Sequence, residues 1–169
     1  ILFDLQPPAA HCKGVFCSTG GDKAPAPRAF HTAVMWRAQM IIFGGWNAKT
    51  KAPANDVCVW DCEKQTWLGT VDTAGPAPSP RSNHSCVIHG DRMIVFGGHN
   101  EYDRESDLHI LNLLSRQPQW SGPIMTQGQV PRPVSHHTAC VHGDKMLIFG
   151  DNGESPALFS LDLAMSKLV

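Results

Sequence analysis

The chain has 169 residues and a formal net charge of −1, from 14 Lys and Arg against 15 Asp and Glu. This balance gives no electrostatic support for a nucleic-acid partner. No apolar run approaches the roughly 20 residues that insertion across a membrane needs. Charged residues make up 17 % of the chain, below the usual level of about 25 %, so we expect much of the chain to be buried.

A repeat of 53 residues organises the sequence. His31, His84 and His137 have this spacing, and so do Trp67 and Trp120. Each histidine is followed by an apolar run that starts with Met and ends in Phe-Gly, at 40–44, 93–97 and 146–150. So many matches at one interval indicate a tandem structural unit rather than coincidence.

Each period is predicted to hold short strands. In the first unit they are expected at 33–37, 39–43, 57–61 and 66–70, and in the second at 84–89, 92–96, 108–113 and 119–123. The third unit repeats the apolar run and ends with a strand at 157–163. Gly90-Asp91 and Gly143-Asp144 are good signals for two-residue hairpin turns. No segment sustains the periodicity of a capped helix, and four antiparallel strands recurring about every 40–55 residues are typical of a propeller blade.

The apolar runs predict strands that are covered on both faces, because they are apolar at successive positions. The glycines after Phe43 and Phe96 are expected to end these strands where a Cβ atom would obstruct a turn or a close approach of the backbone. The Trp of each fourth strand is expected to fill the wedge between neighbouring sheets. The residues with a predicted structural role in the repeat are Gly44, Gly45, Gly97, Gly98, Gly150, Trp67, Trp120, His31, His84 and His137.

These motifs resemble the kelch repeat, in its longer-period form with an Arg three residues before the His. The first copy joins Arg28 and His31 to the glycine pair, to Asn55-Asp56-Val57 and to Trp67, and the second copy repeats the pattern. The resemblance covers nearly the whole chain and implies an all-β fold, a kelch-type β-propeller fragment of about three four-stranded antiparallel blades. The implied division is the end of a preceding blade at 1–23, blades at 24–76 and 77–129, and a partial blade at 130–169.

The two ends of the chain depart from this pattern. In the third copy Arg132 stands five residues before His137, Asp151 replaces the second glycine, and the Trp is missing. At the other end, residues 1–5 resemble the third strand of an earlier blade, and 14–17 resemble its outer strand with Phe16 at the Trp position. Since a closed ring needs more blades than these, we expect the remaining blades in the same protein, or a second chain that closes the ring.

The repeated polar residues admit two interpretations. The three histidines could meet as metal ligands, but equivalent positions in successive blades are rotated apart, so we expect structural histidines and no metal. Arg28, Arg81 and Arg132 each follow a proline and are expected to bond carbonyls or a carboxylate between blades. A ring of arginines that captures an anion is the alternative.

No constellation of residues supports catalysis. Copper oxidases with a kelch-type propeller need tyrosine ligands, and Tyr102 is the one tyrosine in the chain. Neither a Gly-x-Ser-x-Gly elbow nor a phosphate-binding Gly-rich loop nor His-Glu-x-x-His is present. We therefore predict no enzymatic activity and no cofactor for these residues. A catalytic domain in the same protein stays open, because similar kelch arrays are fused to phosphatase domains.

The cysteine pattern favours a reducing compartment. The six cysteines show no disulfide framework of a small secreted protein. Cys58 and Cys62, four residues apart, leave open a strained bridge or half of a metal site. We expect reduced, mostly buried cysteines and a cytoplasmic protein, and the resemblance extends this to a cytoskeletal or ciliary location.

Antiparallel strand order predicts the binding surface. The loops from the second to the third strand, and those leading into the next unit, must lie at the same end of the sheets. These are the long connections at 46–55, 99–106, 151–156, 71–80 and 121–133, and function concentrates in loops that a rigid scaffold holds. The predicted protein-binding residues are Trp46, Asn47, His99, Asn100, Tyr102, Arg104 and Asn152. The predicted function is a non-catalytic protein-interaction scaffold in a substrate adaptor or in a cytoskeletal, ciliary or trafficking complex.

Overall fold

The computed structural model describes residues 23–129, 131–151 and 156–164, and within these ranges the regular structure is entirely β. The expected strands at 1–5 and 14–17, and Asn152, lie outside the described residues. The strands of the first sheet are β1 (Arg28–Ala29), β2 (Thr32–Trp36), β3 (Gln39–Asn47), β4 (Ala52–Asp61) and β5 (Thr66–Thr70). The second sheet holds β6 (Ser85–His89), β7 (Arg92–His99), β8 (Arg104–Asn112) and β9 (Gln119–Ser121). The third holds β10 (Thr138–His142), β11 (Lys145–Asp151) and β12 (Pro156–Asp162).

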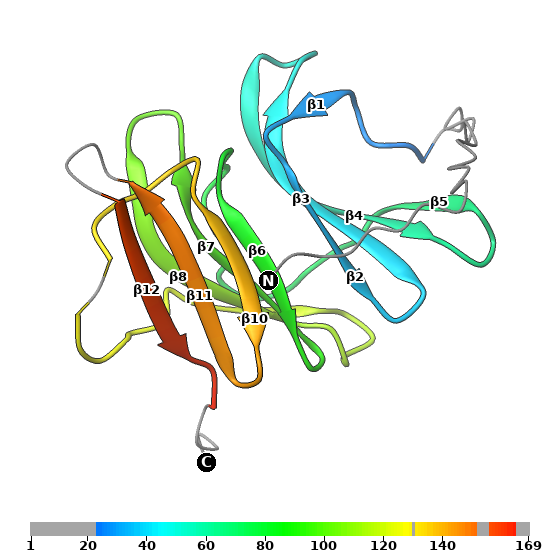
Figure 1. Ribbon diagram of the computed structural model, residues 1–169. Coiled ribbons are helices and arrows are strands. Elements are labelled where there is room, and N and C mark those ends of the chain that lie inside the picture. Colours follow the sequence, from blue (N-terminus) through cyan, green and yellow to red (C-terminus); the bar gives the residue numbers. More distant parts are fainter. Residues whose placement is uncertain (1–22, 130, 152–155, 165–169) are drawn as a thin grey trace, which may run out of the picture.

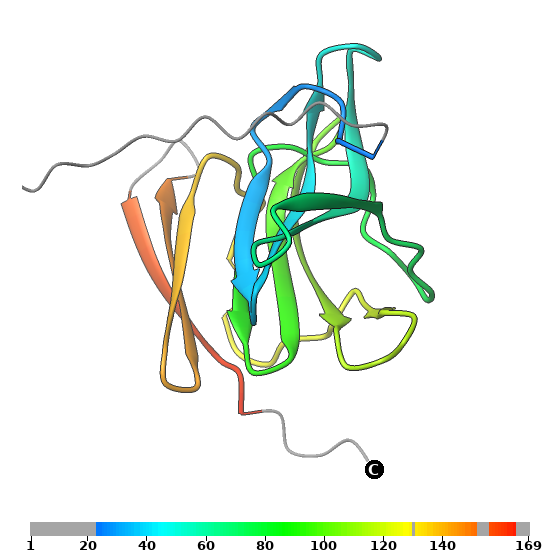
Figure 2. The same ribbon diagram turned by 90° about the vertical axis from the view of Figure 1, so that its right-hand side faces the viewer.

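Three antiparallel sheets stand side by side in chain order (Figures 1 and 2). Each follows the order of its strands along the chain, β2-β3-β4-β5, then β6-β7-β8-β9, then β10-β11-β12, and β1 adds a short piece beside the end of β3. The innermost strands β2, β6 and β10 contact one another in succession. The two-residue turns lie at the lower end in Figure 1, and the β3–β4 and β7–β8 hairpins lie at the upper end. We call these the lower end and the upper end.

Each gap between sheets contains a hydrophobic core. The core between the first and second sheets includes Phe43, Met93, Val95 and Leu111, none of them measurably exposed. A second core between the second and third sheets includes Phe96, Met146 and Ile148. Successive residues of β3 and β7 are buried, as expected for strands between two layers. The sheets therefore depend on one another for burial of their apolar faces.

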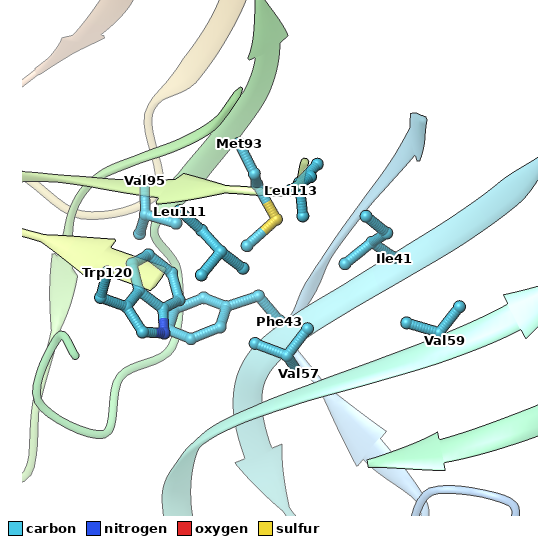
Figure 3. Packing of buried hydrophobic residues seen from close by; sticks show 9 residues of the cluster. All are labelled: Ile41, Phe43, Val57, Val59, Met93, Val95, Leu111, Leu113 and Trp120. Carbon is cyan, nitrogen blue, oxygen red and sulfur yellow. The ribbon is translucent and has the colours of Figure 1, made fainter. Parts of the chain in front are cut away.

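Trp120 closes the first of these cores from β9 (Figure 3). It is 3 % exposed, and its ring lies 5.3 Å from the ring of Phe43 across the gap between the sheets. Trp67 packs edge-on against Trp60 of its own sheet, with ring centroids 5.3 Å apart.

The prediction that the glycine pairs end their strands is wrong. Both pairs lie inside β3 and β7, at a shift of register, and have positive φ, for example 91° at Gly45 and 102° at Gly98. The bulge brings the backbone against the repeated histidine: a Cβ on Gly98 would lie 2.7 Å from the Cβ of His84. Glycine is required because it tolerates both the positive φ and the close approach.

The strands consequently run further toward the upper end than predicted. The connections between second and third strands shrink to four-residue hairpins at 48–51 and 100–103. In the third sheet the register continues evenly, with Phe149 opposite Leu158 and Gly150 opposite Ala157. There a Cβ on Gly150 would lie 2.5 Å from the Cβ of His137, so this glycine alone provides the close approach.

Candidate interaction surface

The repeated histidines join each sheet to the one before it. His84 Nε2 lies 2.7 Å from Thr32 Oγ1, and His137 Nε2 lies 2.8 Å from Ser85 Oγ. Thr32 and Ser85 are themselves the residues after His31 and His84, so each unit supplies a histidine to the preceding unit and a hydroxyl to the following one. These bonds are structural, because they hold consecutive sheets in register at the upper end.

Each of these histidines also packs against a phenylalanine of the preceding sheet. His84 meets Phe43 edge-on at 5.2 Å between ring centroids, and His137 meets Phe96 at 5.5 Å. Burial lowers the pKa of His84 to about 3 and that of His137 to about 4, and neighbouring positive charges contribute to both shifts. Both imidazoles are therefore neutral at physiological pH.

Acidification is expected to weaken the contacts between the sheets. Because the pKa of His84 is lower in the folded state than the unfolded value of about 6.5, stability is complete above that value and is lost as the pH falls below it. Between pH 7 and pH 5 the free energy of unfolding should fall by about 2 kcal/mol on account of His84 alone. Urea unfolding at both pH values measures this. A His84→Gln variant should lose less stability over the same interval, and an unchanged slope would contradict the assignment.

A second set of contacts joins the sheets at the lower end. Asp91 Oδ1, in the turn after β6, accepts a 2.9 Å hydrogen bond from Trp36 Nε1 of the first sheet. In the next unit Asp144 Oδ1 lies 2.9 Å from His89 Nε2. Trp36 and His89 are 53 residues apart, as are Asp91 and Asp144. The neighbouring sheets are thus fixed at both ends, which makes a rigid support for the hairpins above.

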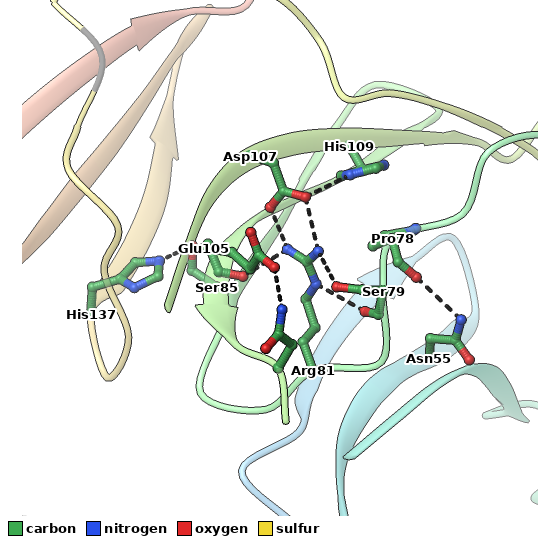
Figure 4. A network of polar contacts seen from close by, with 11 residues as sticks. Asn55, Pro78, Ser79, Arg81, Ser85, Glu105, Asp107, His109 and His137 are labelled. Atoms are coloured by element: carbon green, nitrogen blue, oxygen red, sulfur yellow. Dashed lines mark hydrogen bonds and ion pairs between the residues drawn. The ribbon is translucent and has the colours of Figure 1, made fainter. Parts of the chain in front are cut away.

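Arg81 is the centre of a buried polar network at the upper end (Figure 4). Its side chain has no measurable exposure and forms a bidentate ion pair with Asp107, at 2.5 and 2.9 Å. Its guanidinium also donates to the carbonyl of Gly97 and to Ser79, and Asp107 Oδ2 lies 2.9 Å from His109 Nε2. Burial alone would raise the pKa of Asp107, but the hydrogen bonds from His109 and Arg81 hold it well below its usual value.

Arg28 makes the same contacts in the first sheet. It pairs with both carboxylate oxygens of Asp56, at 2.6 and 2.8 Å, and donates to the carbonyl of Gly44. The predicted carbonyl and carboxylate partners are therefore present, but the side-chain bonds lie within one sheet. Arg81 contacts the first sheet through its main chain instead: its N–H donates to Ala54 O, and its carbonyl accepts from the N–H of Gly45.

In the third unit the position of the arginine belongs to Val134 rather than to Arg132. Val134 N donates to Glu105 O and Val134 O accepts from Gly98 N, which repeats the main-chain bonds of Arg81. The aspartates of the two ion pairs, Asp56 and Asp107, directly precede Val57 and Leu108. The equivalent residue in the third sheet, directly before Leu158, is Ala157. Both members of the ion pair are thus replaced together by apolar residues. This joint loss supports a structural role for the arginines, and not a ring that captures an anion.

The alternative metal sites find no geometric support. Among the residues that the structure describes, no three His, Cys, Asp or Glu side chains are grouped so as to hold a metal ion. Cys58 and Cys62 are free thiols, the first buried and the second exposed. Burial raises the pKa of Cys86 to about 12, so this thiol stays protonated. Within the same residues no helix has the length and apolar character to cross a bilayer.

Most of the predicted binding residues lie at the upper end. Trp46 and Asn47 end β3, His99 ends β7, and Arg104 begins β8. Trp46 is 40 % exposed and Tyr102, in the β7–β8 hairpin, is 84 % exposed. We call the exposed Trp46, Tyr102 and Arg104, together with the two hairpins, the upper surface.

The two predicted asparagines are engaged within their own hairpins. Asn47 Oδ1 accepts the N–H groups of Lys49 and Thr50, and Asn100 Oδ1 accepts those of Tyr102 and Asp103. These bonds form the hairpins, as asparagine side chains commonly do in turns. The two asparagines therefore shape the upper surface. The side chains that are free to contact a partner are the exposed aromatic and charged ones.

Sequence reasoning missed Phe30. This residue lies between β1 and β2 and is 59 % exposed, and its neighbour Ala29 pairs with Trp46. Its φ is 58°, and the equivalent Asn83 and His136 are also positive, at 54° and 63°. A hydrogen bond runs from Asn83 N to Phe30 O and another from His136 N to Asn83 O. Phe30 lies inside the repeated Arg-x-x-His motif, so the sequence marks its position. Only the backbone conformation shows that its side chain is exposed.

A cavity of about 290 Å³ lies between the first and second sheets toward the lower end. Its lining is mostly apolar, with Gln39, Ser115 and Arg116 as the polar members. The remaining lining residues are Trp36, Ile41, Val57, Val59, Leu68, Val71, Leu113 and Pro118. No acid–base pair lines it, so its chemistry suits packing rather than catalysis.

Comparison with known proteins agrees with this geometry. A family model described as the KLHDC2/KLHL20/DRC7 Kelch-repeats domain matches residues 14–167. Kelch domain-containing protein 1 of Mus musculus is 39 % identical over 116 residues, 68 % of this chain and 26 % of the relative. Acyl-CoA-binding domain-containing protein 4 of Arabidopsis thaliana is 34 % identical over 148 residues, 86 % of this chain and 21 % of the relative. Host cell factor 2 of Homo sapiens is 36 % identical over 142 residues, 75 % of this chain and 17 % of the relative.

The chain therefore spans about a quarter or less of the length of these relatives. The family model covers all of the described sheets, and the 53-residue unit of the sequence corresponds to one sheet of the structure. The chain belongs to the kelch-repeat family, and its three sheets are blades of a kelch β-propeller.

Proposed function

We propose that the chain is a non-catalytic scaffold that binds another protein through the upper surface. The observation that carries the proposal is the exposure of two large aromatic side chains, Trp46 at 40 % and Tyr102 at 84 %, on hairpins held by buried contacts. Tryptophan, tyrosine and arginine are the residues that most often dominate binding energy at interfaces. A kelch domain is a protein-interaction module in general, which supports this choice.

The charges of the upper surface favour a partner that presents both acidic and basic side chains. Lys49 and Lys51 lie in or beside the first hairpin, and Glu101 and Asp103 lie in the second, next to Arg104. Opposite charges on neighbouring hairpins orient a partner more than they add affinity. The fixed blades keep the hairpins in place, so little conformational entropy is lost on binding.

A combined Trp46→Ala, Tyr102→Ala and Arg104→Ala variant tests the proposal. Partners captured with the intact protein in cell extracts should be identified first, and their affinities then measured with purified proteins. The variant should bind at least about 30-fold more weakly, as expected for the loss of about 2 kcal/mol at a hot spot.

The matched control is Leu114→Ala, since Leu114 is 62 % exposed but follows β8 at the lower end. This control should leave the affinity unchanged. If the triple variant folds and binds as the unchanged protein does, the binding surface lies elsewhere.

The names of the relatives support two settings for such a scaffold. One relative, 31 % identical over 144 residues, is the "Dynein alpha chain, flagellar outer arm" of Chlamydomonas reinhardtii, of which the match covers 3 %. This supports a place in a cytoskeletal or ciliary assembly. The appearance of similar segments within an acyl-CoA-binding domain-containing protein supports the second candidate, a propeller that positions another domain of the same protein.

A further inference from the structure

The cavity between the first and second blades has a size that suits a small ligand. Its volume is about 290 Å³, roughly twice that of an apolar cavity that holds benzene, so it has room for about twelve non-hydrogen atoms. Figure 3 shows part of its wall, with Ile41 of the first blade facing Leu113 of the second. Ligand sites in proteins are concave and mostly apolar, with a few polar groups that fix the orientation of the ligand.

The mouth of this cavity exposes apolar surface to solvent. Leu68 of β5 lines the cavity and is 38 % exposed. Ser115 and Arg116, in the loop between β8 and β9, line it from the second blade and are exposed as well. A small molecule can therefore reach the apolar wall directly from solvent.

The blade repeat does not require this apolar lining. Trp36 and Leu68 line the cavity, and the residues 53 positions later, in the second blade, are His89 and Ser121. His89 is polar and bonded, with its Nε2 2.9 Å from Asp144 Oδ1 of the third blade. The fold thus accepts polar side chains at both positions. The apolar pair is a property of the gap between the first and second blades and not of the repeat.

Arg116 gives the mouth of the cavity a positive charge that is not neutralised. Within the part of the chain that the structure describes it forms no hydrogen bond and no ion pair, whereas Arg28 and Arg81 each pair with an aspartate. None of the residues that line the cavity is acidic. A guanidinium binds carboxylate and phosphate groups through parallel hydrogen bonds. An anion at the mouth therefore meets attraction from Arg116 and no repulsion from the lining.

We infer that the cavity binds a small amphipathic anion, with its apolar group against Ile41, Leu68 and Leu113 and its carboxylate or phosphate group on Arg116. The ligand is bound without chemical change, since no acid–base pair lines the site. The cavity lies toward the lower end, so this inference does not depend on the partner proposed for the upper surface.

Calorimetric titration of the intact protein with decanoate tests the inference. Decanoate joins an apolar chain of suitable size to a carboxylate, and we expect it to bind at a single saturable site. Decanol, which has the same chain and no charge, should bind at least about tenfold more weakly. Decyl phosphate identifies the preferred anion: tighter binding than decanoate assigns a phosphate group, and weaker binding assigns a carboxylate. If neither anion binds saturably, the inference is overturned.

Two variants at the mouth locate the ligand. Arg116→Gln should weaken the binding of decanoate about tenfold and leave that of decanol unchanged, because only the charged contact is lost. Leu68→Ser, which copies Ser121 of the second blade, should weaken both ligands about tenfold, because part of the apolar wall is removed. Since Leu68 and Arg116 are both exposed, neither substitution should disturb the fold.

Lys64→Gln is the matched control for the charge. The side chain of Lys64 is 73 % exposed and carries the same charge as Arg116, but it does not line the cavity. This variant should bind decanoate as the unchanged protein does. An equal loss in Lys64→Gln and Arg116→Gln would mean that net charge alone matters, and full binding by both Arg116→Gln and Leu68→Ser would place the ligand elsewhere. Either result overturns the inference, and neither bears on the upper surface, whose variants are read out by partner affinity.

Discussion

An Asp107→Ala variant is expected to lose about 3–5 kcal/mol of unfolding free energy, because it leaves a buried cation without its partner. Arg81 has no measurable exposure, and Asp107 provides both carboxylate oxygens of its bidentate pair. The carbonyl of Gly97 and Ser79 remain as acceptors, but neither is charged. Urea unfolding at neutral pH measures the loss. As a control, Asp103→Ala in the exposed hairpin should change stability by less than about 0.5 kcal/mol.

The third blade supplies the second arm of this test. It has Val134 and Ala157 at the positions of the pair, so an Arg81→Val, Asp107→Ala double variant copies an arrangement already present in the chain. The double variant should be more stable than Asp107→Ala alone by at least about 1 kcal/mol, since no charge is left buried and unpaired. If the two substitutions simply add, the ion pair is not the reason for the cost.

Replacing Gly98 by Ala is expected to cost about 3–5 kcal/mol, from backbone strain and steric overlap together. The φ of Gly98 is 102°, and an added Cβ would lie 2.7 Å from the Cβ of His84 and 2.8 Å from the carbonyl of Ser82. The histidine cannot move away freely, because its ring is held by Thr32 and Phe43 of the first blade. Thermal or urea unfolding measures the effect.

Gly128 separates the two causes of this cost. Its φ is 91°, similar to that of Gly98, but nothing lies within 4 Å of an added Cβ. Gly128→Ala should therefore cost only the strain of the backbone, about 1–3 kcal/mol. Equal losses in the two variants would show that the contact with His84 does not matter, and the role assigned to the bulge would be wrong.

The sequence predicts the arrangement of the sheets well because the repeat records it directly. A spacing of 53 residues between His31, His84 and His137 implies equivalent positions, and the structure gives each blade the same strand order. Burial on both faces of β3 and β7 follows from their unbroken apolar runs. These features can be predicted because they depend on periodicity and not on the conformation of any one residue.

The details that the sequence did not reveal depend on backbone conformation. A glycine pair is compatible with the end of a strand and with a bulge inside it, and only the register shift after Phe43 and Phe96 decides between them. Likewise Arg132 resembles the other arginines by residue type, whereas main-chain hydrogen bonds assign the equivalent position to Val134. The hydrogen bonds from Asn47 and Asn100 to their own hairpins likewise become evident only when the turn geometry is known.

A double-mutant cycle between Phe43 and Trp120 tests most directly the claim that successive sheets pack against one another as propeller blades. The two rings belong to different sheets and lie 5.3 Å apart. The free energy of unfolding should be measured with urea for Phe43→Leu, Trp120→Leu and the double variant. The coupling energy between the two substitutions should be about 0.5–1.5 kcal/mol. A coupling of zero, with each single variant folded, would mean that the first and second sheets do not pack together, and the propeller account would fail.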